Sequence, residues 1–215
     1  MPAEVKICGL TRPVDAEFAD AAGASYLGVI FAGGPRERTP ADARATLSGR
    51  RARKVGVFAA QSAAEVSEIA SFVGLDVVQL HGTISVARVA EVRAATGLEV
   101  WAVVRTSTGV LTADDEELAD TADALVVDAL VPGRLGGTGV AIPWMELGES
   151  LDAMASGHRI VLAGGLTAGN VADAIDYVSP MVVDVSSGVE SSPGIKDQKL
   201  VRAFIAAARA SGATE

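Results

Sequence analysis

The sequence predicts an α/β fold, a single (β/α)8 barrel (TIM barrel) of parallel strands formed by residues 1–215. Three observations support this prediction. Short β-rich runs alternate with alanine-rich amphipathic segments, eight such pairs follow one another, and the strand-like runs are apolar throughout, as is typical of parallel strands that are buried on both faces. An open doubly wound sheet is the alternative, but no Gly-x-Gly-x-x-Gly motif follows the first strand.

The expected strands are short and rich in Val, Ile and Leu, and they are bounded by Gly, Pro or charged residues. In chain order they cover residues 4–8, 26–31, 54–58, 76–80, 99–104, 124–127, 159–162 and 181–184. One helix is expected after each strand, because a parallel strand pair requires a crossover connection.

Helix boundaries are indicated by capping residues. Pro13 suits a first helical turn and Gly23 a C-terminal cap. Ser62, with Glu65 three residues later, forms the capping-box pattern. The remaining helices are expected to begin near residues 40, 85, 114, 143, 168 and 197. The one over 114–119 is predicted to be short.

The composition excludes several classes of protein. Apolar residues make up 49% of the chain and charged residues 21%, which indicates a globular protein. Aromatic residues are only 4%, and 27 acidic against 18 basic residues give a net charge of −9. The electrostatic field of this negative net charge repels nucleic acid, whereas a small anionic ligand can still bind through local backbone amides.

Cysteine and histidine are rare in the chain. One Cys and two His permit no intramolecular disulfide and offer no convincing metal-site spacing. No signal peptide and no apolar run of membrane-spanning length is evident. We therefore expect a cytoplasmic protein without a metal, a nucleic-acid partner or a membrane partner. The sequence does not decide between monomer and homodimer.

Active sites of such barrels lie at the carboxyl ends of the strands. Gly164 and Gly165 follow the seventh strand, and Ser187 and Gly188 follow the eighth. Loops after these two strands often bind phosphate, because small residues let backbone N–H groups approach the phosphate oxygens and a helix N-terminus adds a favourable dipole. Plain tight turns are the alternative interpretation.

Cys8 and Asp128 end the first and sixth strands, on opposite sides of the predicted mouth. Two titratable groups across a pocket can move protons on two substrate atoms. Lys6 shares the face of Cys8 one layer deeper, and a cation there would favour the thiolate. Asp184 lies on the neighbouring eighth strand, so we expect a buried Lys6–Asp184 ion pair closer than about 6 Å. An inert thiol and a helix-capping aspartate are the alternatives.

Three further polar residues follow strands at the same end. Arg36 lies in the loop after the second strand, where a guanidinium can hold a substrate carboxylate bidentately. Arg38 is a competitor for this role, and a surface position is the alternative. His81, after the fourth strand, is a candidate for hydrogen bonding to substrate or for a structural role. Arg105, after the fifth, is a candidate second anion contact or a salt-bridge partner.

Seven segments share their order and spacing with one known family. They are KICGLT (6–11), GVIF (28–31), VGVF (55–58), VQLHG (78–82), GGTG (136–139), LAGGLT (162–167) and VDVSSGVE (183–190), together with Asp128, Trp144, Asn170, Pro193 and Lys196. The chain therefore resembles the phosphoribosylanthranilate isomerases of tryptophan biosynthesis over nearly its whole length. It departs from the usual family pattern at Gly34, Ala60 and Thr83, which puts substrate affinity in question more than reaction type.

The resemblance implies a cofactor-free Amadori rearrangement of N-(5-phosphoribosyl)anthranilate to 1-(2-carboxyphenylamino)-1-deoxyribulose 5-phosphate. It implies that Asp128 is the general acid, Cys8 the general base and Arg36 the ligand of the anthranilate carboxylate. The glycine pair and the Ser187-Gly188 turn would hold the phosphate of this small-molecule substrate. The glycine-rich loop 130–140 is predicted to close over it.

Two other functions remain open at this point. A related phosphosugar isomerase of histidine biosynthesis, or a bifunctional barrel, uses similar chemistry but an aspartate base after the first strand, and Cys8 argues against it. A barrel that binds a phosphorylated ligand without turnover is the non-enzymatic alternative.

Overall fold

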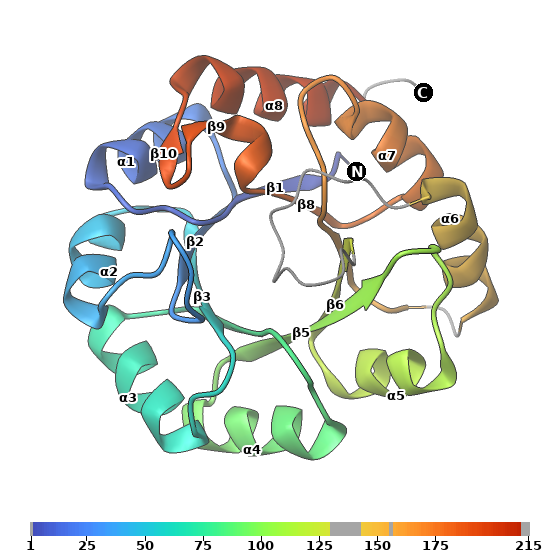
Figure 1. Ribbon diagram of the computed structural model, residues 1–215, viewed down its shortest axis with the longest axis horizontal. Helices are drawn as coiled ribbons and strands as arrows, with labels where there is room; N and C mark the ends of the chain where they lie inside the picture. Colours follow the sequence, from blue (N-terminus) through green and yellow to red (C-terminus); the bar gives the residue numbers. More distant parts are fainter. Residues whose placement is uncertain (1, 130–142, 155–156, 212–215) are drawn as a thin grey trace.

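The computed structural model describes residues 2–129, 143–154 and 157–211. Its eight parallel strands form a closed barrel in sequential order, and the helices form an outer ring around it (Figure 1). The barrel closes between β1 and β8, where Lys6 pairs in register with Asp184. The predicted (β/α)8 barrel is therefore confirmed.

Every predicted strand is present, with boundaries within two residues of those expected. The strands are β1 Glu4–Ile7, β2 Tyr26–Ile30, β3 Arg53–Phe58, β4 Val77–Leu80, β5 Glu99–Thr106, β6 Ala124–Ala129, β7 Ile160–Leu162 and β8 Val182–Val185. β5 and β6 each run two residues further than predicted, because the pairing of Arg105 with Asp128 and of Thr106 with Ala129 extends their ladder.

The predicted helices are also present. They are α1 Pro13–Ala22, α2 Pro40–Leu47, α3 Ala63–Val73, α4 Val86–Thr96, α5 Ala113–Thr121, α6 Trp144–Ala153, α7 Val171–Val178 and α8 Gln198–Ala210. Gly23 caps α1 in the left-handed conformation (φ 96°), and Ser62 and Glu65 form the expected capping box of α3. Among the helices of the described residues, none is long and apolar enough to cross a membrane.

The expected start of the seventh helix at residue 168 is wrong by three residues. α7 begins at Val171, because the Asn170 side chain organises the preceding turn. Its Oδ1 accepts from the Thr167 backbone N–H at 2.7 Å, and its Nδ2 donates to the Gly165 carbonyl at 3.0 Å. This turn separates Gly164 and Gly165 from the first turn of α7.

The segment between β8 and α8 contains structure that the sequence did not predict. A short 3-10 helix, η1 (Ser187–Val189), leads into an antiparallel hairpin of β9 (Glu190–Ser192) and β10 (Ile195–Lys196). The Thr11 hydroxyl donates to the Gly194 carbonyl in the hairpin turn. The hairpin is thereby attached to the loop after β1, at the carboxyl ends of the strands.

The core has two layers, one between the strands and the helices and one inside the barrel. The outer layer packs the strands against the helices. The inner layer fills the barrel around Trp101 and Tyr26, whose rings meet edge to face at 5.0 Å. Its other members are Val55, Val77, Val103, Ala124, Val126, Val161, Ala163 and Val182. This layer fills the interior, and the space for a ligand that the described residues form lies at the carboxyl ends of the strands.

Candidate active site

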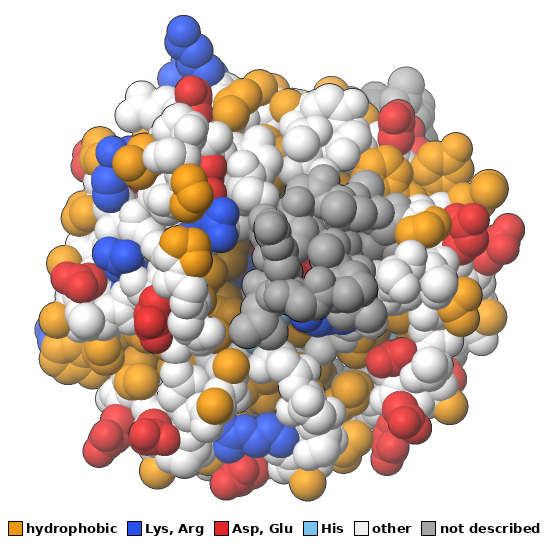
Figure 2. All heavy atoms as spheres, in the orientation of Figure 1, with side chains coloured by type: hydrophobic (Ala, Val, Ile, Leu, Met, Phe, Trp, Pro, Cys, Tyr) orange, Lys and Arg blue, Asp and Glu red, His pale blue; other side chains and the backbone are white. Residues whose placement is uncertain are grey.

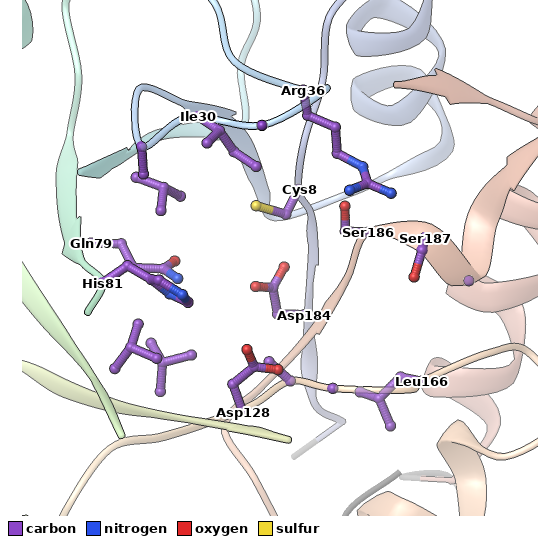
Figure 3. A pocket seen from close by; sticks show the side chains of 18 of the residues that line it. Cys8, Ile30, Arg36, Gln79, His81, Asp128, Leu166, Asp184, Ser186 and Ser187 are labelled. Atoms are coloured by element: carbon purple, nitrogen blue, oxygen red, sulfur yellow. The ribbon is translucent and has the colours of Figure 1, made fainter. Parts of the chain in front are cut away.

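A cavity of about 570 Å³ lies at the carboxyl ends of the strands. Nine of the residues singled out in the sequence line it: Cys8, Arg36, His81, Asp128, Gly164, Gly165, Asp184, Ser187 and Gly188. Figure 3 shows the side chains of six of them surrounding one space from several strands and loops: Cys8, Arg36, His81, Asp128, Asp184 and Ser187. The sequence therefore located the pocket. Lys6 and Arg105 do not line it, but each contacts a carboxylate that does.

Cys8 follows β1 directly, and its backbone N–H donates to Val185 on β8 at 2.9 Å. Gly28 gives the thiol its room, because a Cβ there would lie 2.9 Å from Sγ. Burial raises the pKa of the thiol, and the nearby Lys6 ammonium lowers it only in part. Lys6 therefore favours the thiolate, as expected, but the desolvation of the buried thiol is the larger effect on its pKa.

Lys6 and Asp184 form the predicted ion pair beneath the cavity. Lys6 Nζ donates to Asp184 Oδ2 at 2.8 Å, and the lysine is fully buried. Burial alone would lower the pKa of Lys6, but the Asp184 carboxylate and Cys8 raise it above its usual value. Asp184 Oδ1 has no hydrogen-bond partner among the described residues, and Asp184 lines the cavity. One edge of this buried carboxylate is therefore available to a ligand.

Asp128 enters the cavity from β6, on a different side from Cys8 (Figure 3). Its side chain is buried, and Arg105 on the neighbouring strand brings Nε to 4.0 Å from Oδ2. Arg105 is therefore a salt-bridge partner of Asp128, one of the two roles that the sequence left open. A carboxyl group and a thiol are thus held near the ends of different strands in one pocket, an arrangement that suits proton transfer at two substrate atoms.

Arg36 lines the cavity but is held by a carboxylate that sequence reasoning missed. Its Nε and Nη2 donate to Glu190 at 2.8 and 2.7 Å. Lys196 Nζ donates to the same Glu190 at 2.8 Å. Both partners lie within the matched family segments, but only the fold brings them next to residue 36. Arg38, the expected competitor, is not among the residues that line the cavity.

The two small-residue turns after β7 and β8 meet at one side of the cavity. Gly164 and Gly165 have positive φ angles of 89° and 67°, which L side chains rarely adopt. A Cβ on Gly188 would lie 2.0 Å from the carbonyl oxygen of Leu166. The two turns are therefore in direct backbone contact, and their glycines leave space for a ligand against the main chain.

His81 and Gln79 line the cavity from β4 and the residue that follows it. Burial, with Arg105 and Lys6 nearby, lowers the pKa of His81 to about 4, so the imidazole is neutral at pH 7. Neither His81 Nε2 nor Gln79 Oε1 has a partner among the described residues. Gln79 was missed as a site residue, although strand alternation places it two positions before His81 on the same face.

Two other expectations concern loops. Of the family departures, Gly34 lines the cavity, whereas Ala60 and Thr83 do not. The loop 130–140, predicted to close over a ligand, lies outside the described residues.

Comparisons with known proteins agree with this geometry. Residues 5–207 match the family model described as N-(5'phosphoribosyl)anthranilate (PRA) isomerase. The N-(5'-phosphoribosyl)anthranilate isomerase of Rhodopseudomonas palustris (strain BisB18) is 41% identical, with 98% of each chain covered.

Solved structures give the same result. One contains monomers generated from the dimeric phosphoribosylanthranilate isomerase of Thermotoga maritima (TM-score 0.82, 32% identity, 97% of this chain and 99% of that chain). Another is a phosphoribosyl anthranilate isomerase bound to reduced 1-(o-carboxyphenylamino)-1-deoxyribulose 5-phosphate (TM-score 0.82, 30% identity, 97% and 99% covered).

Proposed function

Because the chain belongs to the N-(5'-phosphoribosyl)anthranilate isomerase family, we propose that Cys8 and Asp128 are the base and the acid of its reaction. The protein is an isomerase of tryptophan biosynthesis. The observation that carries the proposal is that Cys8 and Asp128 line one cavity from different strands. An Amadori rearrangement needs two proton transfers, one at the ribose ring oxygen and one at C2.

Asp128 performs the first transfer. It gives its proton to the ring oxygen as the C1–O bond breaks, and the nitrogen lone pair forms the C1=N double bond of an iminium ion. The carboxylate that remains is stabilised by Arg105, whose Nε lies 4.0 Å from it. Its burial keeps water from competing for the proton.

Cys8 performs the second transfer. It removes the C2 proton, the electron pair moves towards the iminium nitrogen, and the resulting enolamine tautomerises to the ketone. The raised pKa means that only a fraction of the thiol is ionised at neutral pH, but that fraction is a strong base. Lys6, directly below, lowers the free energy of the thiolate.

The ends of the substrate are fixed on either side of these groups. The turns at Gly164-Gly165 and Ser187-Gly188 bind the phosphate through backbone N–H groups, because glycine allows the close approach. Arg36 binds the anthranilate carboxylate. This arrangement holds C2 and the ring oxygen between Cys8 and Asp128, which is the positioning on which the rate depends.

An assay with separate binding and rate readouts tests these roles. The purified chain is incubated with N-(5-phosphoribosyl)anthranilate and product is quantified by chromatography, with the histidine-pathway substrate as the comparison. Asp128→Asn and Cys8→Ala should lower kcat far more than they weaken binding of the reduced product analogue. If either variant loses only affinity, its residue binds substrate and does not transfer a proton.

We further propose that residues 1–215 act as one domain in the cytoplasm, as a monomer or a homodimer. The matched Thermotoga maritima protein is described as dimeric, and its solved structure is of monomers generated from it. Light scattering across a concentration series distinguishes them for this chain.

A further inference from the structure

Glu190 is the centre of a buried ion cluster at the rim of the cavity. Its Oε1 accepts from Arg36 Nε and from Lys196 Nζ, both at 2.8 Å, and its Oε2 accepts from Arg36 Nη2 at 2.7 Å. Lys196 Nζ also donates to the Ser186 carbonyl at 3.0 Å. The Lys196 and Glu190 side chains are only 1% and 4% exposed. Glu190 is thus fixed by donors from two separate segments.

The orientation of Arg36 follows from these contacts. Glu190 uses the Nε–Nη2 edge of the guanidinium, while Nη1 has no hydrogen-bond partner among the described residues. The side chain crosses Gly9, where a Cβ would lie 2.6 Å from Arg36 Cδ. Figure 3 shows the guanidinium reaching from the loop after β2 towards Ser186, at the edge of the cavity. Both the aliphatic part and the guanidinium group of Arg36 are therefore constrained, and the second edge of the guanidinium is left for a ligand.

The charge of the cluster points to an anionic ligand. Arg36 and Lys196 contribute two positive charges and Glu190 one negative charge, so the three side chains carry one uncompensated positive charge. An incoming carboxylate neutralises it. Such a carboxylate also fits the remaining Nη1–Nη2 edge as a bidentate acceptor.

We propose that Glu190 and Lys196 are positioning residues that set the free edge of Arg36 as the receptor for the substrate carboxylate. The proposal rests on the proposed function, in which Arg36 binds the anthranilate carboxylate. Glu190 acts through Arg36, and Lys196 holds Glu190 in place.

The alternative role for Glu190 is that of a competitor, which a substrate carboxylate must displace from Arg36. The two roles predict opposite signs. If Glu190 aligns Arg36, its removal weakens binding of the carboxylate. If it competes, its removal strengthens that binding. The contact with Lys196 favours alignment, because it holds Glu190 even while Arg36 binds a second anion.

Calorimetry with two stable ligands tests the proposal. One is the reduced product analogue, and the other is the same compound without the ring carboxylate. Wild-type protein should prefer the carboxylated ligand. The ratio of the Kd of the carboxylate-free ligand to that of the carboxylated ligand measures this preference. Glu190→Gln should reduce the ratio by at least about tenfold, as expected for a buried charge pair. The Kd of the carboxylate-free ligand should stay within about threefold of its wild-type value. A general loss of structure would instead weaken the binding of both ligands.

Controls separate this role from a structural one. Glu99→Gln removes an arginine-paired carboxylate at the other end of the barrel and should leave the Kd ratio unchanged. Glu190→Gln should add nothing in an Arg36→Met background, because the effect passes through Arg36. Should Glu190→Gln fail to fold, Lys196→Gln provides the same test and should lower the ratio in the same direction.

The outcomes distinguish the two levels of the argument. A wild-type protein that does not prefer the carboxylated ligand overturns the role of Arg36 in the proposed function. If the wild-type protein prefers the carboxylated ligand and Glu190→Gln retains or increases this preference, the present proposal is overturned. The role of Arg36 is then unaffected.

Discussion

Ion pairs occur at both ends of the barrel, but in different surroundings. At the amino ends of the strands, Glu99 pairs with Arg53 at 3.0 Å and with Arg159 at 3.5 Å, and these side chains are 30–38% exposed. At the carboxyl ends, Lys6 and Asp184 pair at 2.8 Å with 0% and 8% exposure. Similar chemistry is thus solvated at one end and buried at the other.

The difference supports the proposal that the buried pair belongs to the active site. An exposed pair is screened by water and contributes little free energy. A buried pair carries a desolvation penalty that hydrophobic residues would avoid, so its presence needs another reason. At the mouth that reason is the site: Lys6 lies beside Cys8, and Asp184 presents an unpaired oxygen in the cavity wall. On the face that Figure 2 shows, acidic side chains are spread around the periphery.

The largest expected effect is on catalysis at the mouth. Asp128→Asn keeps the size of the side chain but removes the proposed proton donor, and kcat should fall by about 10²–10⁴-fold. Steady-state assays together with binding of the reduced product analogue measure it. A fall of less than about tenfold would show that another group protonates the ring oxygen.

The next effect is on stability. Lys6→Met leaves Asp184 buried without its partner, and the free energy of unfolding should fall by about 3–5 kcal/mol. Urea unfolding measures this change. Adding Asp184→Leu should restore much of the loss, because a hydrophobic pair avoids the desolvation penalty. If the Lys6→Met variant is as stable as wild type, the pair is not desolvated in the folded protein.

A smaller effect concerns pH. The folded-state pKa of His81 is about 4, below its usual 6.5, so between these values the unfolded chain binds the extra proton. Stability is therefore lost as pH falls from about 6.5 towards 4. His81→Gln should flatten that part of the stability curve in urea titrations. Parallel curves for the two proteins would mean that the imidazole titrates normally in the folded state.

The smallest effect is expected at the opposite end. Glu99→Gln breaks two exposed pairs and should change the free energy of unfolding by less than about 1 kcal/mol, with kcat unchanged. Urea unfolding and the same assay serve as the measurement. A loss as large as that of Lys6→Met would remove the distinction between the two ends.

Much of the fold was predictable because its signals are local. Apolar runs, the Pro13 and Gly23 positions and the Ser62–Glu65 box depend on residues that are close in sequence. The hairpin of β9 and β10 was not predicted, because its segments are too short to show a period. The start of α7 was misplaced, because Asn170 uses its side chain in a turn.

The site was predictable where it follows from the rule that the active sites of such barrels lie at the carboxyl ends of the strands. Residues that end strands, such as Cys8 and Asp128, fall at the mouth by topology alone. Lys6 and Asp184 were paired from strand alternation and barrel closure, which the structure confirms. Glu190 was not identified as the partner of Arg36, because they are 154 positions apart and belong to loops. The direction of the Cys8 pKa shift was left open in the sequence, because it depends on the balance between burial of the thiol and the charge of Lys6.

In the proposed mechanism Cys8 removes the C2 proton and Asp128 opens the ring. Single-turnover rates of Cys8→Ala and Asp128→Asn, each with ordinary and C2-deuterated substrate, test it most directly. Loss of the base should make C2–H cleavage limiting, so Cys8→Ala should be slow and show a primary isotope effect larger than that of Asp128→Asn. A Cys8→Ala enzyme with the wild-type rate and isotope effect would contradict the account.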